Sequence, residues 1–162
     1  MATWSELESD APALAEAGRA LLYQFGVGLG YLASVRADGG PRLHPFCPIL
    51  HEGGLYGLIG HSPKQRDLLR DGRYAIHSFP SPDRDDEFYL TGRAAPRGDA
   101  ALAAAVRRTM TATGATSSGD ETLFEFDIER VLLATYKKRG EPHNWPPVYT
   151  KWVDPRRRPR GG

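Results

Sequence analysis

The chain has 162 residues, of which 40% are hydrophobic and 25% are charged, the composition of one ordinary globular domain. Its 21 Lys and Arg nearly balance its 20 Asp and Glu, so net charge draws it neither to nucleic acid nor to acidic membranes. No apolar run approaches the ~20 residues that span a bilayer, and residues 1–10 are polar and acidic, unlike a secretory leader. Cys47 is the only cysteine, so no intrachain disulfide is possible. From all these features together we expect a soluble cytoplasmic protein with no membrane partner.

The first predicted element is a helix that begins after Asp10. Its apolar residues fall three and four positions apart, as on one helix face, at Leu14, Gly18, Leu21, Leu22 and Phe25. Asp10 would cap this helix and Pro12 suits its first turn. We expect the glycines at 26, 28 and 30 to end it.

The pattern then changes to the two-residue alternation of strands, first at 31–35. Asp38-Gly39-Gly40 is typical of a hairpin turn and leads into a return strand over 42–50. Because proline cannot donate to a neighbouring strand, Pro45 and Pro48 predict that this strand is bulged or lies at an edge. The turn at 52–54 leads to a third strand at 55–59.

The next predicted helix has unusually complete end signals. Ser62 suits the N-cap, Pro63 the first helical position, and Gly72 the position just past the end. Leu68 and Leu69 would anchor the helix to the core.

Three further strands, at 74–79, 88–95 and 123–136, surround one more helix. Asp99 would cap that helix, whose apolar face carries Leu102, Val106 and Met110. In the last strand region Phe124, Phe126 and Ile128 share a face. Six strand-like segments with flanking helices predict a mainly β (α+β) fold, a closed or nearly closed antiparallel barrel over residues 1–136.

From residue 137 onward the chain is rich in Pro, Arg and Lys and has no clear period. We expect residues 137–162 to form a basic tail that packs on the domain or trails from it. Such a tail, with Trp152 among its basic residues, could touch nucleic acid or the phosphate of a ligand. A solvated terminus is the commoner explanation, so nucleic acid is not the expected partner.

Ser62-Pro63-Lys64 is the strongest local signal for a ligand. A helix N-terminus offers free N–H groups and the positive end of the helix dipole, which favour a phosphate. The Ser62 hydroxyl adds a donor, and Lys64 and Arg66 add positive charge. The same pattern also describes an ordinary capped helix with solvated basic residues.

Arg42 and His44 fall on one side of the return strand, beside Pro45. They could face a planar ligand or form the polar face of an edge strand. The five histidines are scattered without metal-ligand spacing, and Ser62 has no Gly-x-Ser-x-Gly elbow, so neither a metal site nor a hydrolase is expected. The glycines at 26–30 follow no strand and precede no helix, which excludes a dinucleotide loop.

Six stretches are informative as an ordered set: GYLASVRADG at 30–39, PRLHP at 41–45, LYGLI at 55–59, SPKQRDLL at 62–69, DGRYAIH at 71–77 and EFYLTGR at 87–93. In this order and spacing the chain resembles the pyridoxamine 5'-phosphate oxidase-like, FMN-binding split-barrel proteins. The resemblance implies a six-stranded antiparallel split barrel. It also implies a homodimer that holds one flavin in each of two grooves at the subunit interface.

The resemblance further implies a set of cofactor-binding residues: Arg42, His44, Pro45, Ile59, Gly60, Ser62, Lys64 and Glu87. Ser62 and Lys64 would hold the phosphate, and Ile59 and Gly60 would offer backbone groups to the flavin. Glu87 stands where some relatives place a polar residue near the cofactor.

One feature of the oxidase proper is missing, because residues 152–158 lack its C-terminal Arg-x-His pair. We therefore expect an FMN-dependent oxidoreductase that acts on another small organic substrate or a quinone, with no catalytic residue identified. One alternative is a reductase that uses the deazaflavin F420. A non-catalytic flavin- or haem-binding module is another, in which His44, His61 or His143 would ligate the haem.

Overall fold

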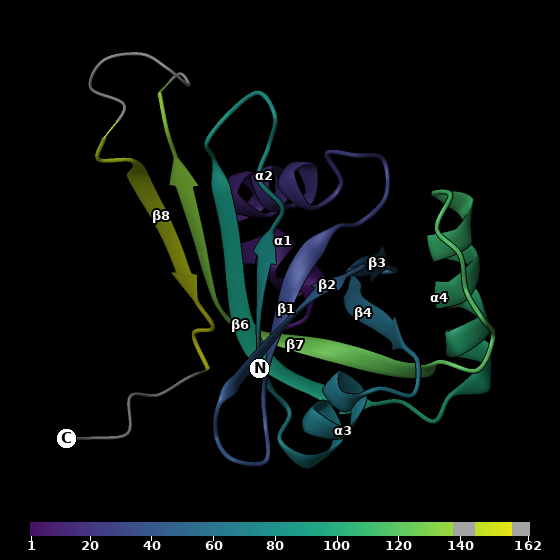
Figure 1. The fold of residues 1–162 in the computed structure, drawn as a ribbon. Helices are drawn as coiled ribbons and strands as arrows, with labels where there is room; N and C mark the ends of the chain where they lie inside the picture. Colours follow the sequence, from purple (N-terminus) through teal and green to yellow (C-terminus); the bar gives the residue numbers. More distant parts are fainter. Residues whose placement is uncertain (138–144, 157–162) are drawn as a thin grey trace.

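The computed structural model describes residues 1–137 and 145–156 (Figure 1). The helices among these residues are α1 (Trp4–Asp10), α2 (Pro12–Leu22), α3 (Pro63–Arg70) and α4 (Ala100–Ala112). The strands are β1 (Gly30–Val35), β2 (Pro41–Phe46), β3 (Ile49–His51), β4 (Gly54–Ile59), β5 (Arg73–Ser78), β6 (Glu87–Pro96), β7 (Thr122–Thr135) and β8 (Val148–Val153).

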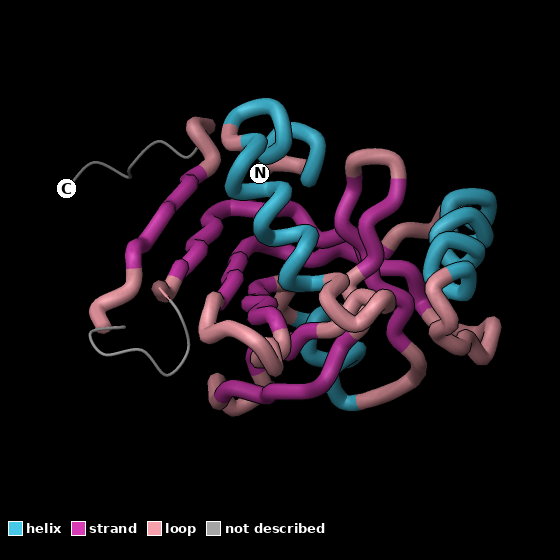
Figure 2. The backbone as a smooth tube through the Cα atoms, turned by 90° about the horizontal axis from the view of Figure 1, so that it is seen from above, coloured by secondary structure: helices cyan, strands magenta, loops and turns pink. Residues whose placement is uncertain are grey.

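All of these strands belong to one antiparallel sheet in the order β2-β1-β5-β6-β7-β4-β3, and β8 also pairs with β7. The sheet curls like an opened barrel, as Figure 2 shows from above. Since β6 pairs with β7 along most of its length, β4 and β8 share the other edge of β7, at opposite ends. Ala2 forms an isolated bridge to Ile128, between the parts of β7 that pair with β4 and with β8. The N-terminal segment therefore lies along the edge of β7 where these two strands are apart.

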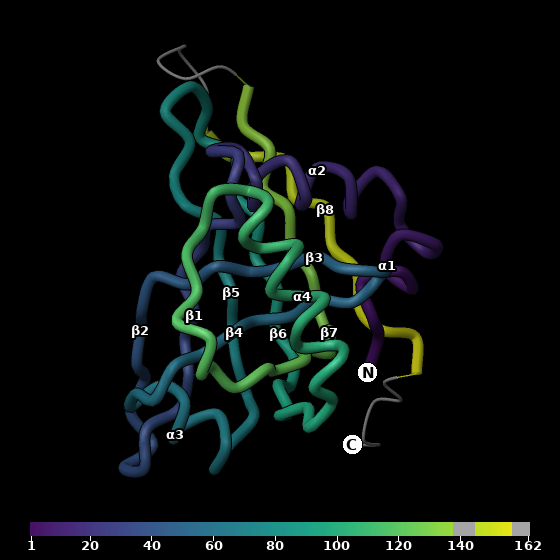
Figure 3. Tube along the Cα trace, turned by 90° about the vertical axis from the view of Figure 1, so that its right-hand side faces the viewer, coloured from purple at the N-terminus to yellow at the C-terminus, as the bar shows by residue number. Residues whose placement is uncertain are grey.

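The core lies between the inner face of this sheet and helices α1 and α2. Aromatic side chains fill much of it, namely those of Trp4, Phe88, Phe124 and Phe126. A smaller apolar cluster joins α4 to β3 and β4, and Figure 3 shows α4 in front of these strands. The predicted inner face of β7 and the predicted apolar face of α4 are confirmed by this packing.

The termini meet in a group of charged side chains that we call the terminal clasp: Glu6, Asp154 and Arg156, with the amino group of Met1. Asp154 is only 1% exposed and accepts a hydrogen bond from Arg156 Nε at 3.0 Å. The Met1 amino group lies 3.1 Å from Asp154, and Arg156 also reaches Glu6 Oε1 at 2.8 Å. Each charge of the clasp therefore has an opposite partner.

The predicted edge position of the return strand is confirmed, because β2 and β3 occupy the two ends of the strand order. The predicted count of six strands is wrong. The return strand is interrupted at residues 47–48 and forms two strands in separate parts of the sheet. The tail supplies another strand, β8, whose Trp152 packs against the core although the sequence around it shows no period.

The helix ends correct several smaller predictions. Asp10 ends α1 instead of capping α2, whose N-cap is Ala11, and Phe25 lies past the helix end and is 47% exposed. Leu68 is buried as expected, but Leu69 is exposed. Gly72 does follow α3, for a different reason: a Cβ there would lie 2.4 Å from the carbonyl oxygen of Ala94 on β6. None of the described helices is long and apolar enough to cross a bilayer.

Candidate functional site

Strand β2 and helix α3 bring four of the eight predicted cofactor residues close together, Arg42, His44, Ser62 and Lys64. We call this the β2–α3 crevice and define it by Arg42, His44, Ser62, Lys64 and Asp67. Along β2, the residues at 42 and 44 are half-buried and alternate with exposed neighbours, so both side chains turn to the same side. Figure 3 shows α3 next to the lower part of β2.

The N-terminus of α3 has the capping chemistry that its sequence predicts. The Ser62 hydroxyl oxygen accepts a hydrogen bond from the backbone N–H of Gln65 at 3.3 Å, and Pro63 occupies the first turn. Proline has no N–H, and the N–H of Gln65 is used by the cap. The donors left to bind an anion are therefore the backbone N–H of Lys64 and the Ser62 hydroxyl.

Asp67 holds Arg42 in the crevice. Arg42 Nε donates to Asp67 Oδ2 at 2.6 Å, and Asp67 also accepts from Ser34 at 3.3 Å and from Arg70 at 3.3 Å. Burial opposes the charge of Asp67, but the hydrogen bonds from the two arginines outweigh it and lower the pKa of this carboxyl. The ion pair with Asp67 uses Nε, so the terminal nitrogens of Arg42 remain outside it.

Lys64 extends from α3 to β2, where its Nζ lies 3.5 Å from the carbonyl oxygen of Pro45. Burial lowers the pKa of Lys64, and no carboxylate in residues 1–137 or 145–156 lies within ion-pair distance of its amine. The pKa of His44 is lowered too, first by burial and then by the positive charges of Lys64 and Arg42. The crevice therefore has an excess of positive charge.

The backbone at the end of β4 lies beside this charge. Ile59 is buried, and its carbonyl oxygen already accepts a hydrogen bond from Gln65 Nε2 at 3.1 Å. Gly60 follows in open space, since an added Cβ would meet no atom within 4 Å. Of the two predicted backbone contacts, Gly60 is thus the more accessible. A cavity of about 210 Å³, lined in part by Cys47, Leu58 and Lys64, opens on the same side.

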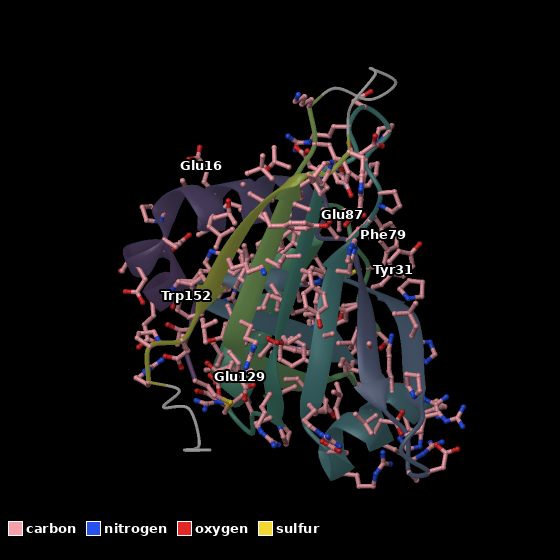
Figure 4. The ribbon with its side chains drawn as sticks, turned by 90° about the vertical axis from the view of Figure 1, so that its left-hand side faces the viewer. Glu16, Tyr31, Phe79, Glu87, Glu129 and Trp152 are labelled. Atoms are coloured by element: carbon pink, nitrogen blue, oxygen red, sulfur yellow. The ribbon has the colours of Figure 1, made fainter. Side chains whose placement is uncertain are left out.

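Glu87 is not part of this crevice in the same protomer. It begins β6, and strands β1 and β5 separate β6 from β2. Figure 4 shows Glu87 beside Phe79 and Tyr31 at the upper end of the sheet, whereas α3 lies at the lower end. There it lines a separate pocket of about 340 Å³, together with His77, Phe79, Asp86 and Tyr136.

The three histidines proposed for haem differ in accessibility. His44 Nε2 is buried and has no hydrogen-bond partner among the described residues, so this nitrogen does not face solvent. His61 is exposed next to the N-cap of α3, and His143 lies outside the described residues. Within the described ranges no group of three metal-binding side chains occurs.

Sequence reasoning missed two buried polar residues of α3 that build the crevice. Asp67 fixes Arg42, and Gln65 ties the helix to β4 and to Thr122 of β7, with Nε2 to Oγ1 at 3.0 Å. Both lie on the helix side that carries Leu68, a spacing that could have indicated their burial. Their partners are distant in sequence and could not have been identified from it.

No protein-family model and no curated protein matches this sequence. Solved structures do share its fold. A haem-binding protein from Mycobacterium smegmatis has a TM-score of 0.60 at 20% identity over 85% of this chain, which covers only 57% of that protein. A NimC/NimA family protein from Clostridium acetobutylicum has a TM-score of 0.62 at 17% identity, covering 86% of this chain and 94% of that one.

A putative pyridoxamine 5'-phosphate oxidase from Listeria innocua has a TM-score of 0.57 at 21% identity, covering 72% of this chain and 94% of that one. Similarity at these identities establishes the fold. The chain therefore has the split-barrel fold of these pyridoxamine 5'-phosphate oxidase-like and NimC/NimA proteins, as its sequence resemblance predicts.

Proposed function

We propose that this chain binds FMN in the β2–α3 crevice and acts as an oxidoreductase on a small organic substrate or a quinone. The observation that carries the proposal is the excess of positive charge there. Lys64 has no carboxylate partner among the described residues, and after burial, the larger cause, its charge and that of Arg42 lower the pKa of His44. A phosphate would supply the missing negative charge.

The residues present fit a flavin phosphate in three respects. The Ser62 hydroxyl and the Lys64 N–H are donors at the positive end of a helix. The Lys64 amine adds a flexible charge that can move from the Pro45 carbonyl to a stronger acceptor. The open space beside Gly60 would let a ring approach the backbone closely.

FMN, when bound, supplies the hydride transfer. The chain's own groups then bind and orient it. Arg42, which Asp67 holds in place, would keep a fixed guanidinium beside the cofactor, and His44 would present a neutral imidazole because burial and the nearby charges lower its pKa. We assign no general acid or base. The one carboxyl among the residues that define the crevice, Asp67, has a lowered pKa and therefore stays ionised near neutral pH.

We also propose that the protein is a homodimer with the cofactor at the subunit interface. The outer face of the sheet supports this, because large apolar side chains are exposed on it, including Leu43 at 64% and Tyr89 at 36%. An exposed apolar face of this kind commonly marks an interface. Sedimentation or light scattering would give twice the mass of the chain, and a monomeric mass at micromolar concentration would contradict the proposal.

The test of the function is the cofactor itself. The purified protein should be yellow, with a flavin absorbance spectrum, or should bind added FMN stoichiometrically after removal of any cofactor. Mass spectrometry of the released cofactor would separate FMN from F420, which also presents a phosphate and a flat ring. A protein that neither retains nor binds FMN would refute the proposal.

Haem binding is the second candidate, and it is favoured by one specific observation. His61 is exposed directly before Ser62, at the rim of the crevice, and a structure of the same fold is named a haem-binding protein. This candidate predicts a Soret band on addition of haem that His61→Ala abolishes. A band that persists in that variant would exclude His61 as the ligand.

A further inference from the structure

The pocket around Glu87 lies outside the β2–α3 crevice and is the larger of the two cavities described above, at about 340 Å³. It opens between the 79–86 loop and the end of β7. That volume is within the range of pockets that hold small molecules.

Two aromatic residues, Phe79 and Tyr136, line the pocket. Phe79 stacks on Tyr31 of β1, with ring centroids 4.4 Å apart and planes at 30°, and its carbonyl oxygen accepts a hydrogen bond from Gln24 Nε2 at 2.8 Å. The backbone N–H of Tyr136 donates to Asp86 Oδ1 at 2.9 Å. The Phe79 ring and the backbone at Tyr136 are thus held before any ligand arrives, which reduces the entropic cost of binding.

Three carboxylates, those of Asp85, Asp86 and Glu87, line the pocket against one cation, Arg84. Asp86 is used by Tyr136 and by Arg84, whose Nη1 lies 3.7 Å away, whereas Glu87 has no ion-pair partner in the part of the chain that the structure describes. His77 Nδ1 lies 2.7 Å from the carbonyl oxygen of Ser78, so it must donate its proton there. With the Nδ1 proton used in this way, Nε2 is the ring nitrogen that can accept a hydrogen bond.

The carboxylates of the pocket act on the phenol of Tyr136. The pKa of Tyr136 is raised, first by burial and then by the charges of Glu87, Tyr149 and Asp85. The same carboxylates would attract an ammonium ion placed here, and the faces of the Phe79 and Tyr136 rings would attract it by cation–π interaction.

We propose that this pocket binds an organic ammonium ion with an aromatic or apolar body. Its charged nitrogen pairs with the Glu87 carboxylate and donates to His77 Nε2, and its body packs against Phe79 and Tyr136. This goes beyond the proposed cofactor function and does not require a bound flavin.

The test is a titration with benzylammonium, with neutral benzyl alcohol and anionic benzoate as probes of the same size, followed by calorimetry or ligand-detected NMR. Benzylammonium should bind most tightly and benzoate least. Glu87→Gln should weaken benzylammonium binding about threefold to fivefold, as expected for loss of an exposed charge pair. Phe79→Leu should weaken it by a similar factor.

Glu16→Gln is the matched control, because it removes the same charge as Glu87→Gln. Glu16 is exposed on α2 and lies away from Glu87 in Figure 4. Its binding should equal that of the parent protein. Equal weakening in both glutamine variants, or benzyl alcohol binding as tightly as benzylammonium, would overturn the proposal. Lys64→Ala distinguishes this proposal from the proposed FMN function. The variant should still bind benzylammonium, whether or not the parent protein binds FMN.

Discussion

The β2–α3 crevice and the terminal clasp both hold charges against the protein body, but they differ in balance. In the clasp, the buried carboxylate of Asp154 has two cationic partners, and Arg156 has a further carboxylate in Glu6. In the crevice, Asp67 serves Arg42 and Arg70, while Lys64 has no carboxylate partner among the described residues. The balanced charges of the terminal clasp stabilise the contact between the two ends of the chain. The unpaired positive charge of the β2–α3 crevice instead favours binding of a negatively charged ligand.

The largest expected effect is the loss of FMN affinity when Lys64 of the crevice is replaced. Lys64→Ala should weaken FMN binding about tenfold to a hundredfold, because a hydrogen bond to a charged group is worth about 1.5–3 kcal/mol. Its thermal stability should stay near that of the parent protein, since the amine makes only a 3.5 Å contact to Pro45. Fluorescence titration with FMN measures the first quantity and calorimetry the second.

Lys151→Ala on β8 is the control, since it removes the same charge from an exposed site. A Lys151 variant that loses as much FMN affinity as the Lys64 variant would mean that net charge alone attracts the cofactor.

The converse change in the clasp is Asp154→Asn. The hydrogen bonds and charges around Asp154 outweigh its burial and lower its pKa to about 2, so its ionised form stabilises the fold by about 2 kcal/mol near neutral pH. Because the folded pKa lies below the unfolded one, this stabilisation is present above about pH 4 and is lost as the pH falls toward 2.

Chemical denaturation at pH 7 and at pH 2–4 should therefore show a gap between parent and variant that closes in acid. FMN affinity should be unchanged. A gap that does not depend on pH would contradict the assigned role of the carboxylate.

Gly60→Ala tests whether the space beside β4 is ligand space. The added methyl group meets no protein atom within 4 Å, so the fold should be unaffected. FMN binding should weaken about fivefold, equivalent to about 1 kcal/mol, because the methyl group would occupy room that the ring needs. Unchanged affinity in a stable variant would place the ring elsewhere.

The smallest predicted effect is on His44. A bound phosphate would offset the charges of Lys64 and Arg42, which now lower the pKa of this imidazole after burial. The pKa of His44 should therefore rise when FMN binds, as an NMR titration of the ring would show. Ring signals that titrate identically with and without FMN would argue against a phosphate in the crevice.

Local chemistry explains what the sequence predicted well. The cap at Ser62 and Pro63 acts within one helical turn, and the alternating burial of β7 follows directly from its residue pattern. The separation of β2 from β3 and the pairing of β8 with β7 depend on contacts between distant segments, which residue periodicity does not encode.

The same limit applies to the candidate site. The sequence identified Arg42 and Lys64, but not that Asp67, 25 residues further along, holds one of them while the other has no carboxylate partner among the described residues. The position of Glu87 was likewise beyond reach, since only the strand order shows that β1 and β5 separate it from β2.

The most direct test of the central claim compares FMN with riboflavin, which lacks the phosphate, in the parent protein and in Lys64→Ala. If the crevice binds the phosphate, the parent should prefer FMN by at least about tenfold, and the preference should largely disappear in the variant. Equal affinities for FMN and riboflavin in the parent protein would contradict the claim.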